Sequence, residues 1–433
     1  MSASKPYPGL SVPDEDAIVA EMLGMVARYS QSFPTHKPSR PAPQKHTILL
    51  TGATGVLGAT LLSLLVPTPE VARIYVVNRR SPTGVPLLQR QMEAVAEAGF
   101  DAQEVLSSPK IVLLETNLPE ERIGLSDELV EEIRNSVTHI IHNAYLVNFN
   151  VPLAGFDPNV KTLWHLCNLA LASALPTPPR VMFVSTADVW SKKPVLTGPV
   201  PEIMTDARWA TRGGYGESKW VCENILNEFA QNTPLCPIFM RVGQISGGQN
   251  GAWNSHDWVP AIIRSSVNCL GCLPSLDYDV PWIPGNIVAK AIIEMRDSPY
   301  MVHHLEHPRP VAWNTLFRPM ADTLHIPLVP YETWLDRLEE SGRTIRTPSE
   351  IEAGKRTNPA WTLINMFRGV VASSERAWRR AVGQAIMDMT HSLEVAPSLG
   401  EESCPQLTRE DAVKWLHFWR SIGVLEWQVR AKL

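Results

Sequence analysis

The chain has 433 residues, of which 44% are hydrophobic and 19% are charged, and this composition is typical of a globular protein. Its 39 basic and 44 acidic side chains give a net charge of −5, which argues against a nucleic-acid surface, because such a surface carries a clustered basic excess. No run reaches the roughly 18 apolar residues of a membrane span, and the N-terminus lacks the pattern of a secretory signal. We therefore expect a cytoplasmic protein that binds neither nucleic acid nor a membrane and is long enough for two domains.

The six cysteines lie mostly in apolar runs, which is typical of reduced thiols in a protein core. Cys269 and Cys272 form a single CxxC pair. A structural zinc site needs four ligands, and neither a second pair nor nearby histidines stand in register with this one. We therefore expect no metal site.

Residues 1–45 are rich in proline, and between the prolines one segment has helical periodicity. From Asp14 to Ser30 the apolar side chains recur on one face, which predicts a single amphipathic helix. Because Pro-rich flanks favour extended spacers, residues 1–45 are expected to form a linker whose helix docks on the body of the protein.

From His46 onward, apolar runs alternate with helical patterns. Such alternation is typical of a parallel sheet with helices on both faces, a doubly wound α/β or Rossmann architecture. We expect this domain over residues 46–275 and a smaller, mostly helical substrate domain over residues 276–433, from which one strand near 301–305 returns to the sheet. The expected strands are His46–Leu50, Arg73–Val77, Lys110–Glu115, Thr138–His142, Arg180–Val184 and Pro237–Arg241, and the expected helices are Val56–Leu65, Leu87–Ala98, Ser126–Asn135, Asn159–Ala174, Tyr215–Ala230 and Arg409–Ser421.

A glycine-rich turn joins the first predicted strand to the first predicted helix. Gly52, Gly55 and Gly58 have the spacing GxxGxxG. In a dinucleotide site, one such glycine makes a tight turn, one lets the backbone approach a pyrophosphate, and one lets the helix pack closely on the strand. The helix N-terminus then offers free N–H groups to the phosphates. The context of strand, turn and helix predicts a dinucleotide site, and a turn without a ligand is the alternative.

The end of the second predicted strand distinguishes between the two nicotinamide cofactors. An NAD site usually has an acidic residue here, which binds the ribose 2′-hydroxyl. This chain has Asn78, Arg79 and Arg80 instead. Because a guanidinium binds a 2′-phosphate and a carboxylate repels it, we expect NADPH, held by Arg79 and also by Arg90 from the next helix. Solvated surface arginines are the alternative.

Four residues in the middle of the chain are candidates for the chemistry. Tyr215 and Lys219 lie one turn apart at the start of a predicted helix and so share a face. A phenol with a pKa near 10 is a weak acid–base group at neutral pH, and a neighbouring ammonium is expected to lower that pKa. Ser185 and Thr186 end a predicted strand, at the edge where open α/β sheets place their sites. One of these hydroxyls is expected to bind the same substrate oxygen as the tyrosine.

Together these residues resemble the extended short-chain dehydrogenase/reductase superfamily, in which the hydroxyl four residues before an aromatic residue is catalytic. Trp190 stands in for that aromatic residue, so the resemblance favours Thr186 over Ser185 and implies the catalytic residues Thr186, Tyr215 and Lys219. The cofactor-binding positions expected from the turn and from the resemblance are Gly52, Thr54, Gly55, Val56, Leu57, Gly58, Arg79, Arg90, Asn117, Leu118, Asn143, Ala144, Tyr215 and Lys219.

Longer motifs indicate a particular family within this superfamily. THIIHNAYLVNFNVPLAGFDPNV, GYGESKWVCENIL and FMRVGQISG resemble the thioester reductase family, the terminal reductase domains of non-ribosomal peptide synthetases, polyketide synthases and carboxylic acid reductases. The likeness covers roughly residues 46–320, and the segment with the predicted N-terminal helix is similar to the one that joins a carrier domain to such a reductase. Asn117 departs from the pattern, because the family usually has Asp there, near the adenine.

The resemblance implies that an acyl thioester on the phosphopantetheine arm of a carrier protein is reduced with NADPH to an aldehyde, with a further round giving an alcohol, by a protein expected to be a monomer. The alternative is an extended reductase or epimerase that acts on a free small-molecule carbonyl or an acyl-CoA. Trp282 and Trp313 suit the wall of an apolar channel for the arm, and plain core packing is the alternative for both.

Overall fold

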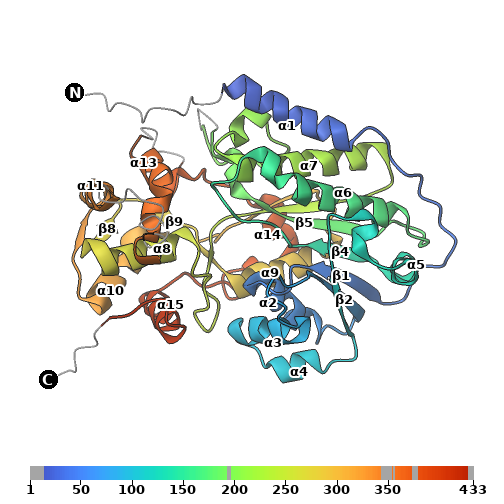
Figure 1. The fold of residues 1–433 in the computed structure, drawn as a ribbon, viewed down its shortest axis with the longest axis horizontal. Coiled ribbons are helices and arrows are strands. Elements are labelled where there is room, and N and C mark those ends of the chain that lie inside the picture. The colour runs from blue at the N-terminus through green and yellow to red at the C-terminus, as the bar shows by residue number, and fades with distance from the viewer. Residues whose placement is uncertain (1–13, 193–196, 343–353, 355, 373–378, 428–433) are drawn as a thin grey trace.

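A seven-stranded parallel sheet forms the centre of the computed structural model, which describes residues 14–192, 197–342, 354, 356–372 and 379–427 (Figure 1). The strand order is β11-β6-β5-β4-β1-β2-β3, and every neighbouring pair in this sheet is parallel. The predicted doubly wound sheet is therefore confirmed, and the strand expected near 301–305 is its edge strand β11. The strands are β1 (His46–Thr51), β2 (Val71–Arg79), β3 (Ile111–Thr116), β4 (His139–His142), β5 (Arg180–Thr186), β6 (Ile238–Val242) and β11 (Val302–Leu305).

Helices cover both faces of the sheet because successive strand residues point to opposite sides. In β1, Leu49 packs into one hydrophobic cluster, and its neighbours Ile48 and Leu50 pack into another. The Leu49 side is covered by α5 (Asp127–Ser136), α6 (Asp157–Leu171) and α7 (Gly214–Asn232), and the opposite side by α2 (Val56–Leu65), α3 (Leu87–Glu97), α4 (Ala102–Leu106) and α9 (Gly285–Glu294).

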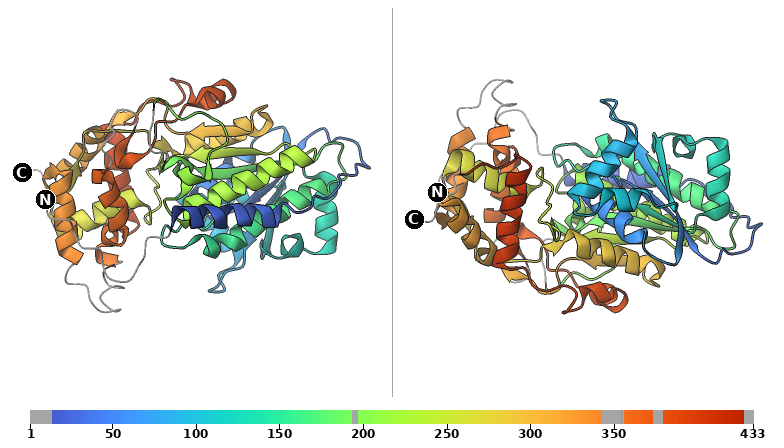
Figure 2. Two further views of the ribbon diagram at one scale, coloured as in Figure 1. Left: turned by 90° about the horizontal axis from the view of Figure 1, so that it is seen from above. Right: turned by 90° about the horizontal axis from the view of Figure 1, so that it is seen from below.

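The predicted N-terminal helix is α1 (Glu15–Tyr29), and it packs against α7 on the outside of the molecule (Figures 1 and 2). Its buried side chains are Met22 and Met25. Arg28 and Tyr29 both bind Asp157 at the start of α6, with distances of 2.9 and 3.0 Å. Helix α1 thus belongs to the outer layer over the face that carries α7.

A second, mostly helical lobe lies beside the carboxyl end of the sheet (Figure 2). Seven buried tryptophans form its core, together with Phe317 and neighbouring aliphatic side chains. Trp253 and Trp258 precede residue 275 and belong to this core, whereas α9 and β11 follow residue 275 and pack with the sheet. The core of the second lobe and the core of the sheet are therefore not divided at residue 275. The helices of the lobe are α8 (Trp258–Ser265), α10 (Trp313–Leu324), α11 (Tyr331–Gly342), α13 (Ile364–Ala372) and α15 (Arg409–Ser421).

Three short strand pairs lie outside the main sheet, among the residues that the structure describes: β7 (Ile245–Ser246) with β10 (Ile283–Pro284), β9 (Asp279–Val280) with β12 (Val311–Ala312), and β8 (Leu273–Ser275) with β13 (Leu328–Pro330). Helix α14 (Thr390–Val395) packs on β11 at the sheet edge. In the described part of the chain, no helix is both long enough and apolar enough to cross a membrane.

Candidate active site

The glycine turn between β1 and α2 has the close contacts that its spacing predicts. Gly52 has a φ of +75°, and a Cβ atom there would lie 2.7 Å from the backbone nitrogen of Ala144. A Cβ atom on Gly58 would lie 2.1 Å from the carbonyl oxygen of Gly52, so the first turn of α2 packs directly on the end of β1. A Cβ atom on Gly55 would meet nothing closer than 3.7 Å. Packing therefore requires glycine at positions 52 and 58, whereas the exposed Gly55 leaves room for a ligand.

The residues at this turn fit a dinucleotide. Gly55 is the N-cap of α2 and no side chain caps that helix, so its first N–H groups are free to bind a pyrophosphate. Thr54, Val56 and Leu57 lie at the same helix start and are half-buried. The loop after β4 approaches from the other side, where the Asn143 side chain donates to the Gly52 carbonyl at 3.2 Å. The backbone N–H groups of Asn143 and Ala144 both donate to the Thr51 hydroxyl.

Gln91 on α3 supports the turn, and the sequence analysis missed it. Its side chain is fully buried, donates to the Ala53 carbonyl at 2.7 Å and accepts from Asn78 at 3.3 Å. A glutamine in an amphipathic helix carries no signal of such a role. The contact fixes the end of β2 relative to the glycine turn.

The two arginines expected at the 2′-phosphate have different surroundings. Arg79 ends β2 and is exposed. Arg90 donates to the Arg79 carbonyl at 3.1 Å, but it also pairs with Glu115 at 2.6 Å. Because the Arg90 guanidinium is held by a carboxylate, Arg79 is the better placed of the two to bind a ligand phosphate.

Two further expected cofactor-binding residues, Asn117 and Leu118, lie directly after β3. Asn117 is exposed, and its side chain donates to Glu120 at 2.7 Å. Leu118 is buried and belongs to the hydrophobic cluster beneath the sheet. Asn117 is therefore open to solvent, and Leu118 contributes mainly packing.

Thr186, Tyr215 and Lys219 meet at the carboxyl edge of the sheet. Thr186 ends β5, and Tyr215 and Lys219 lie on the first turns of α7. The Thr186 side chain hydrogen-bonds Tyr215. The Lys219 ammonium lies 5.6 Å from the centre of the Tyr215 ring. A hydroxyl, a phenol and an amine thus converge from two elements.

The expected lowering of the Tyr215 pKa is wrong for this structure. Burial raises the pKa, and the Asp188 carboxylate raises it further. Lys219 does not offset these effects, because its ammonium donates to the Val184 carbonyl at 2.7 Å and not to the phenol. Tyr215 is therefore protonated at neutral pH and can act as a proton donor.

Lys219 is enclosed by aromatic rings. Its ammonium lies 3.6 Å from the centre of the Tyr145 ring and 4.5 Å from that of Phe183. Burial lowers the pKa of Lys219 to about 7. Tyr145, which also donates to Ser218 at 2.9 Å, is a second residue that the sequence analysis missed, although it directly follows Asn143 and Ala144.

Ser185 is engaged elsewhere. Its hydroxyl donates to Glu223 at 2.5 Å, and Glu223 forms a fully buried ion pair with Arg241 of β6 at 2.7 Å. These three side chains tie β5, β6 and α7 together beneath the site. Of the two hydroxyls at the end of β5, Thr186 is the one beside Tyr215.

Asp188 is a third residue that the sequence analysis did not single out. Its backbone N–H donates to the Thr186 hydroxyl at 3.2 Å, and its carboxylate lies 3.8 Å from Arg212. Burial raises the pKa of Asp188, and Arg212 partly offsets this effect. The only sequence signal was its position two residues after Thr186.

Trp282 and Trp313 pack in the core of the second lobe. They are 2% and 0% exposed, and their ring centres lie 5.7 Å apart. Side chains so deeply buried do not line an open channel, so core packing describes both residues.

The parallel sheet, the glycine turn and the Tyr–Lys pair at the carboxyl edge define a dinucleotide-binding oxidoreductase of the short-chain dehydrogenase/reductase type. Residues 50–292 match the family described as "Male sterility protein", an NAD-binding family, and the chain belongs to that family.

Relatives of this chain are fungal reductases and synthases. It is 44% identical over 406 residues to the adenylate-forming reductase Nps10 of Heterobasidion annosum, an alignment that covers 93% of this chain and 37% of the relative. It is 28% identical over 426 residues to the non-reducing polyketide synthase dbaI of Emericella nidulans, which covers 95% of this chain and 16% of the relative. The chain therefore spans much less than half the length of these relatives.

Solved structures of terminal reductase domains share the fold. The terminal R domain from the myxalamid PKS-NRPS pathway superposes with a TM-score of 0.74 at 25% identity, covering 94% of this chain and 99% of the other. A thiolation-reductase di-domain from an archaeal non-ribosomal peptide synthetase has a TM-score of 0.68 at 16% identity, covering 94% of this chain and 80% of the other. At that identity the second likeness concerns the fold alone.

Proposed function

We propose that this protein reduces an acyl thioester, carried on the phosphopantetheine arm of a carrier domain, with NADPH and releases an aldehyde. The observation that carries the proposal is the meeting of Thr186, Tyr215 and Lys219 at the carboxyl edge of the sheet, next to a glycine turn that fits a dinucleotide. The similarity to adenylate-forming reductases and to a terminal R domain supports a thioester over other carbonyl compounds.

In this mechanism Tyr215 acts as the proton donor. When bound, NADPH supplies the hydride that adds to the thioester carbonyl carbon. Tyr215 donates its phenolic proton to the carbonyl oxygen as negative charge develops there, and Thr186 hydrogen-bonds the same oxygen. The raised pKa of Tyr215 keeps the proton on the phenol until the oxygen becomes basic. The resulting hemithioacetal then breaks its C–S bond, which gives the aldehyde and the free thiol of the arm.

Lys219 has a supporting role. Its ammonium is held near the end of β5 by the Val184 carbonyl and by the rings of Tyr145 and Phe183. It would hold the ribose hydroxyls of NADPH by hydrogen bonds. Hydrogen bonds from Lys219 would then fix the nicotinamide beside Tyr215.

An apolar loop beside Tyr215 supports an acyl substrate. Phe149 lies with its ring centre 5.3 Å from that of Tyr215 and is 47% exposed. Leu146 and Val147 of the same loop are 42% and 60% exposed. Such clustered exposed apolar side chains are typical of a surface that a ligand covers.

NADPH is proposed over NADH because of the end of β2. Arg79 is exposed there, and Asn78 stands where an acidic residue would repel a 2′-phosphate. A carrier domain is proposed as partner because the relatives are much longer than this chain and a thiolation-reductase di-domain shares the fold.

The proposal is tested with the purified protein, NADPH and a series of acyl-pantetheine thioesters. Oxidation of NADPH should depend on the thioester, and Tyr215→Phe should lower the rate at least about 100-fold, because general acid catalysis contributes factors of that size. NADPH binding, measured by fluorescence titration, should be unchanged, since the phenylalanine keeps the ring. Tyr300→Phe, which removes a phenolic hydroxyl bound to Glu394 far from the site, is the matched control and should keep the wild-type rate. Full activity of the Tyr215→Phe protein would refute the proposed mechanism.

A further inference from the structure

A second group of polar side chains lies near Thr186, across the β6–β11 end of the sheet. Thr186 pairs with Val242 of β6, and Val242 pairs with Leu305 of β11. Glu306 follows Leu305 directly. Because neighbouring strands are about 4.8 Å apart, the backbone of Glu306 lies on the order of 10 Å from that of Thr186, at the same edge of the sheet.

The Glu306 carboxyl group is buried and only half satisfied. The residue is 3% exposed, and its Oε1 accepts the backbone N–H of Met387 at 3.3 Å. Its Oε2 has no hydrogen-bond partner within the described residues. Burial raises the pKa of Glu306 to about 8, and the Arg380 guanidinium offsets this only in part. The carboxyl group therefore carries a proton for most of the time at neutral pH.

Gln384 brings an unpaired donor to the same place. A Cβ atom on Gly243 would lie 3.2 Å from the Gln384 side-chain nitrogen and 3.4 Å from the Glu306 Cβ, so both residues pack closely against this glycine. Among the residues that the structure describes, the Gln384 nitrogen has no hydrogen-bond partner, and neither has the Nε of Arg380. Gly243 directly follows β6, the neighbour of the strand that ends in Thr186.

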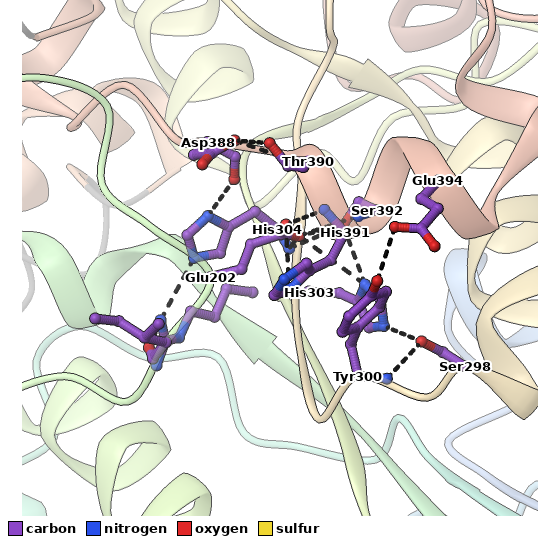
Figure 3. A network of polar contacts seen from close by, with 12 residues as sticks. Glu202, Ser298, Tyr300, His303, His304, Asp388, Thr390, His391, Ser392 and Glu394 are labelled. Carbon is purple, nitrogen blue, oxygen red and sulfur yellow. Dashed lines mark hydrogen bonds and ion pairs between the residues drawn. The ribbon is translucent and has the colours of Figure 1, made fainter.

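Gln384 and Met387 lie on a segment that is held firmly over the sheet edge. Met387 forms a parallel bridge with Val200. The buried Glu202, two residues after Val200, accepts the backbone N–H of His391 at 2.5 Å and that of His304 at 2.9 Å (Figure 3). Glu202 thus joins the start of α14 to β11. The segment that carries Gln384 is thus bonded to its neighbours at the edge of the sheet.

Leaving a buried polar group without a partner is unfavourable, and most such groups in native proteins are paired. Two donors left unpaired beside the same glycine therefore point to a ligand oxygen that accepts from both. We infer that Glu306 and Gln384 form a recognition site for a hydroxyl group on the acyl chain of the substrate. The oxygen of this hydroxyl accepts from the Gln384 amide and from the protonated Oε2 of Glu306. This inference rests on the proposed thioester reduction and adds the chemical class of its acyl group.

The test compares pairs of acyl-pantetheine thioesters that differ only in one hydroxyl group, placed stepwise along the chain. For the best position, wild-type kcat/KM should favour the hydroxylated member at least about tenfold, the effect of roughly 1.4 kcal/mol. In Glu306→Leu and in Gln384→Leu this preference should fall to near one, because a leucine leaves the hydroxyl unpaired. Two variants are used so that a folding failure of one leaves the other informative. Glu332→Leu, an exposed position on α11, is the control and should keep the wild-type preference.

The outcomes separate the two proposals. A wild-type protein that reduces plain thioesters but shows no preference at any hydroxyl position overturns the recognition site and leaves the proposed reaction standing. A preference that persists in both leucine variants also overturns it. A wild-type protein that reduces no thioester at all refutes the proposed function, and the recognition site with it.

Discussion

The two ends of the carboxyl edge of the sheet are built in different ways. At the β1–β2 end, the key contacts are between backbone atoms, such as the approach of Gly58 to the Gly52 carbonyl. At the β6–β11 end, the key contacts join side chains to the backbone of distant segments, and Glu202 accepts the backbone N–H of His391, which is 189 positions further along the chain. The cofactor end is therefore set by local spacing, and the substrate end by tertiary packing. Residues at the β6–β11 end can therefore differ between relatives without disturbing the glycine turn at the β1–β2 end.

The largest expected effect tests the cofactor end. Gly58→Ala should destabilise the protein by about 3 kcal/mol or more in urea unfolding, because its Cβ would overlap backbone that cannot move without displacing β1. Gly55→Ala has room for its Cβ and should change stability by less than about 1 kcal/mol. It should nevertheless weaken NADPH binding at least about tenfold, because the methyl group occupies the approach to the helix N-terminus. Equal losses of stability in the two variants would contradict the assignment of a packing role to Gly58 and a cofactor-binding role to Gly55.

The second prediction concerns Arg79. Arg79→Glu should weaken the binding of NADPH at least about tenfold more than the binding of NADH, because a carboxylate repels the 2′-phosphate that only NADPH carries. Titration with each cofactor gives the two dissociation constants. Arg80→Glu makes the same charge change at the next exposed position and should alter the ratio much less. If Arg79→Glu weakened both cofactors equally, the phosphate role would be excluded.

The third prediction concerns the substrate end and is a pH dependence. The pKa of Glu306 is raised from 4.5 to about 8 in the folded protein. Between these values the folded state binds more protons than the unfolded state, so this group's contribution to stability is full below pH 4.5 and is lost as the pH rises through about 8. In a plot of the free energy of unfolding against pH, Glu306 contributes a slope of at most about 1.4 kcal/mol per pH unit, and Glu306→Gln should remove that contribution. Urea unfolding at several pH values measures it, and identical slopes in both proteins would contradict the assignment.

The sequence predicted the fold because most strands of the sheet are buried on both faces and read as apolar runs. It also predicted the glycine turn, because Gly52, Gly55 and Gly58 lie within a single strand–helix unit. The catalytic roles of Thr186, Tyr215 and Lys219 stay predictions, although the structure brings the three residues together.

What the sequence did not predict depends on burial and on distant contacts. The pKa of Tyr215 was expected to fall, but enclosure and Asp188 raise it. Gln91 supports the glycine turn from another helix. Glu306 and Gln384 meet only after the chain has crossed the second lobe and returned to the sheet edge. None of these environments leaves a periodic signal in the sequence.

The most direct test of the central claim follows the hydride. The protein is incubated with an acyl-pantetheine thioester and NADPH that carries deuterium at the transferable position of the nicotinamide, and the products are identified by mass. The account predicts an aldehyde with one deuterium at its carbonyl carbon together with free pantetheine, or an alcohol with two deuterium atoms if a second round follows. Release of the free acid without deuterium, or an unchanged thioester, would contradict it.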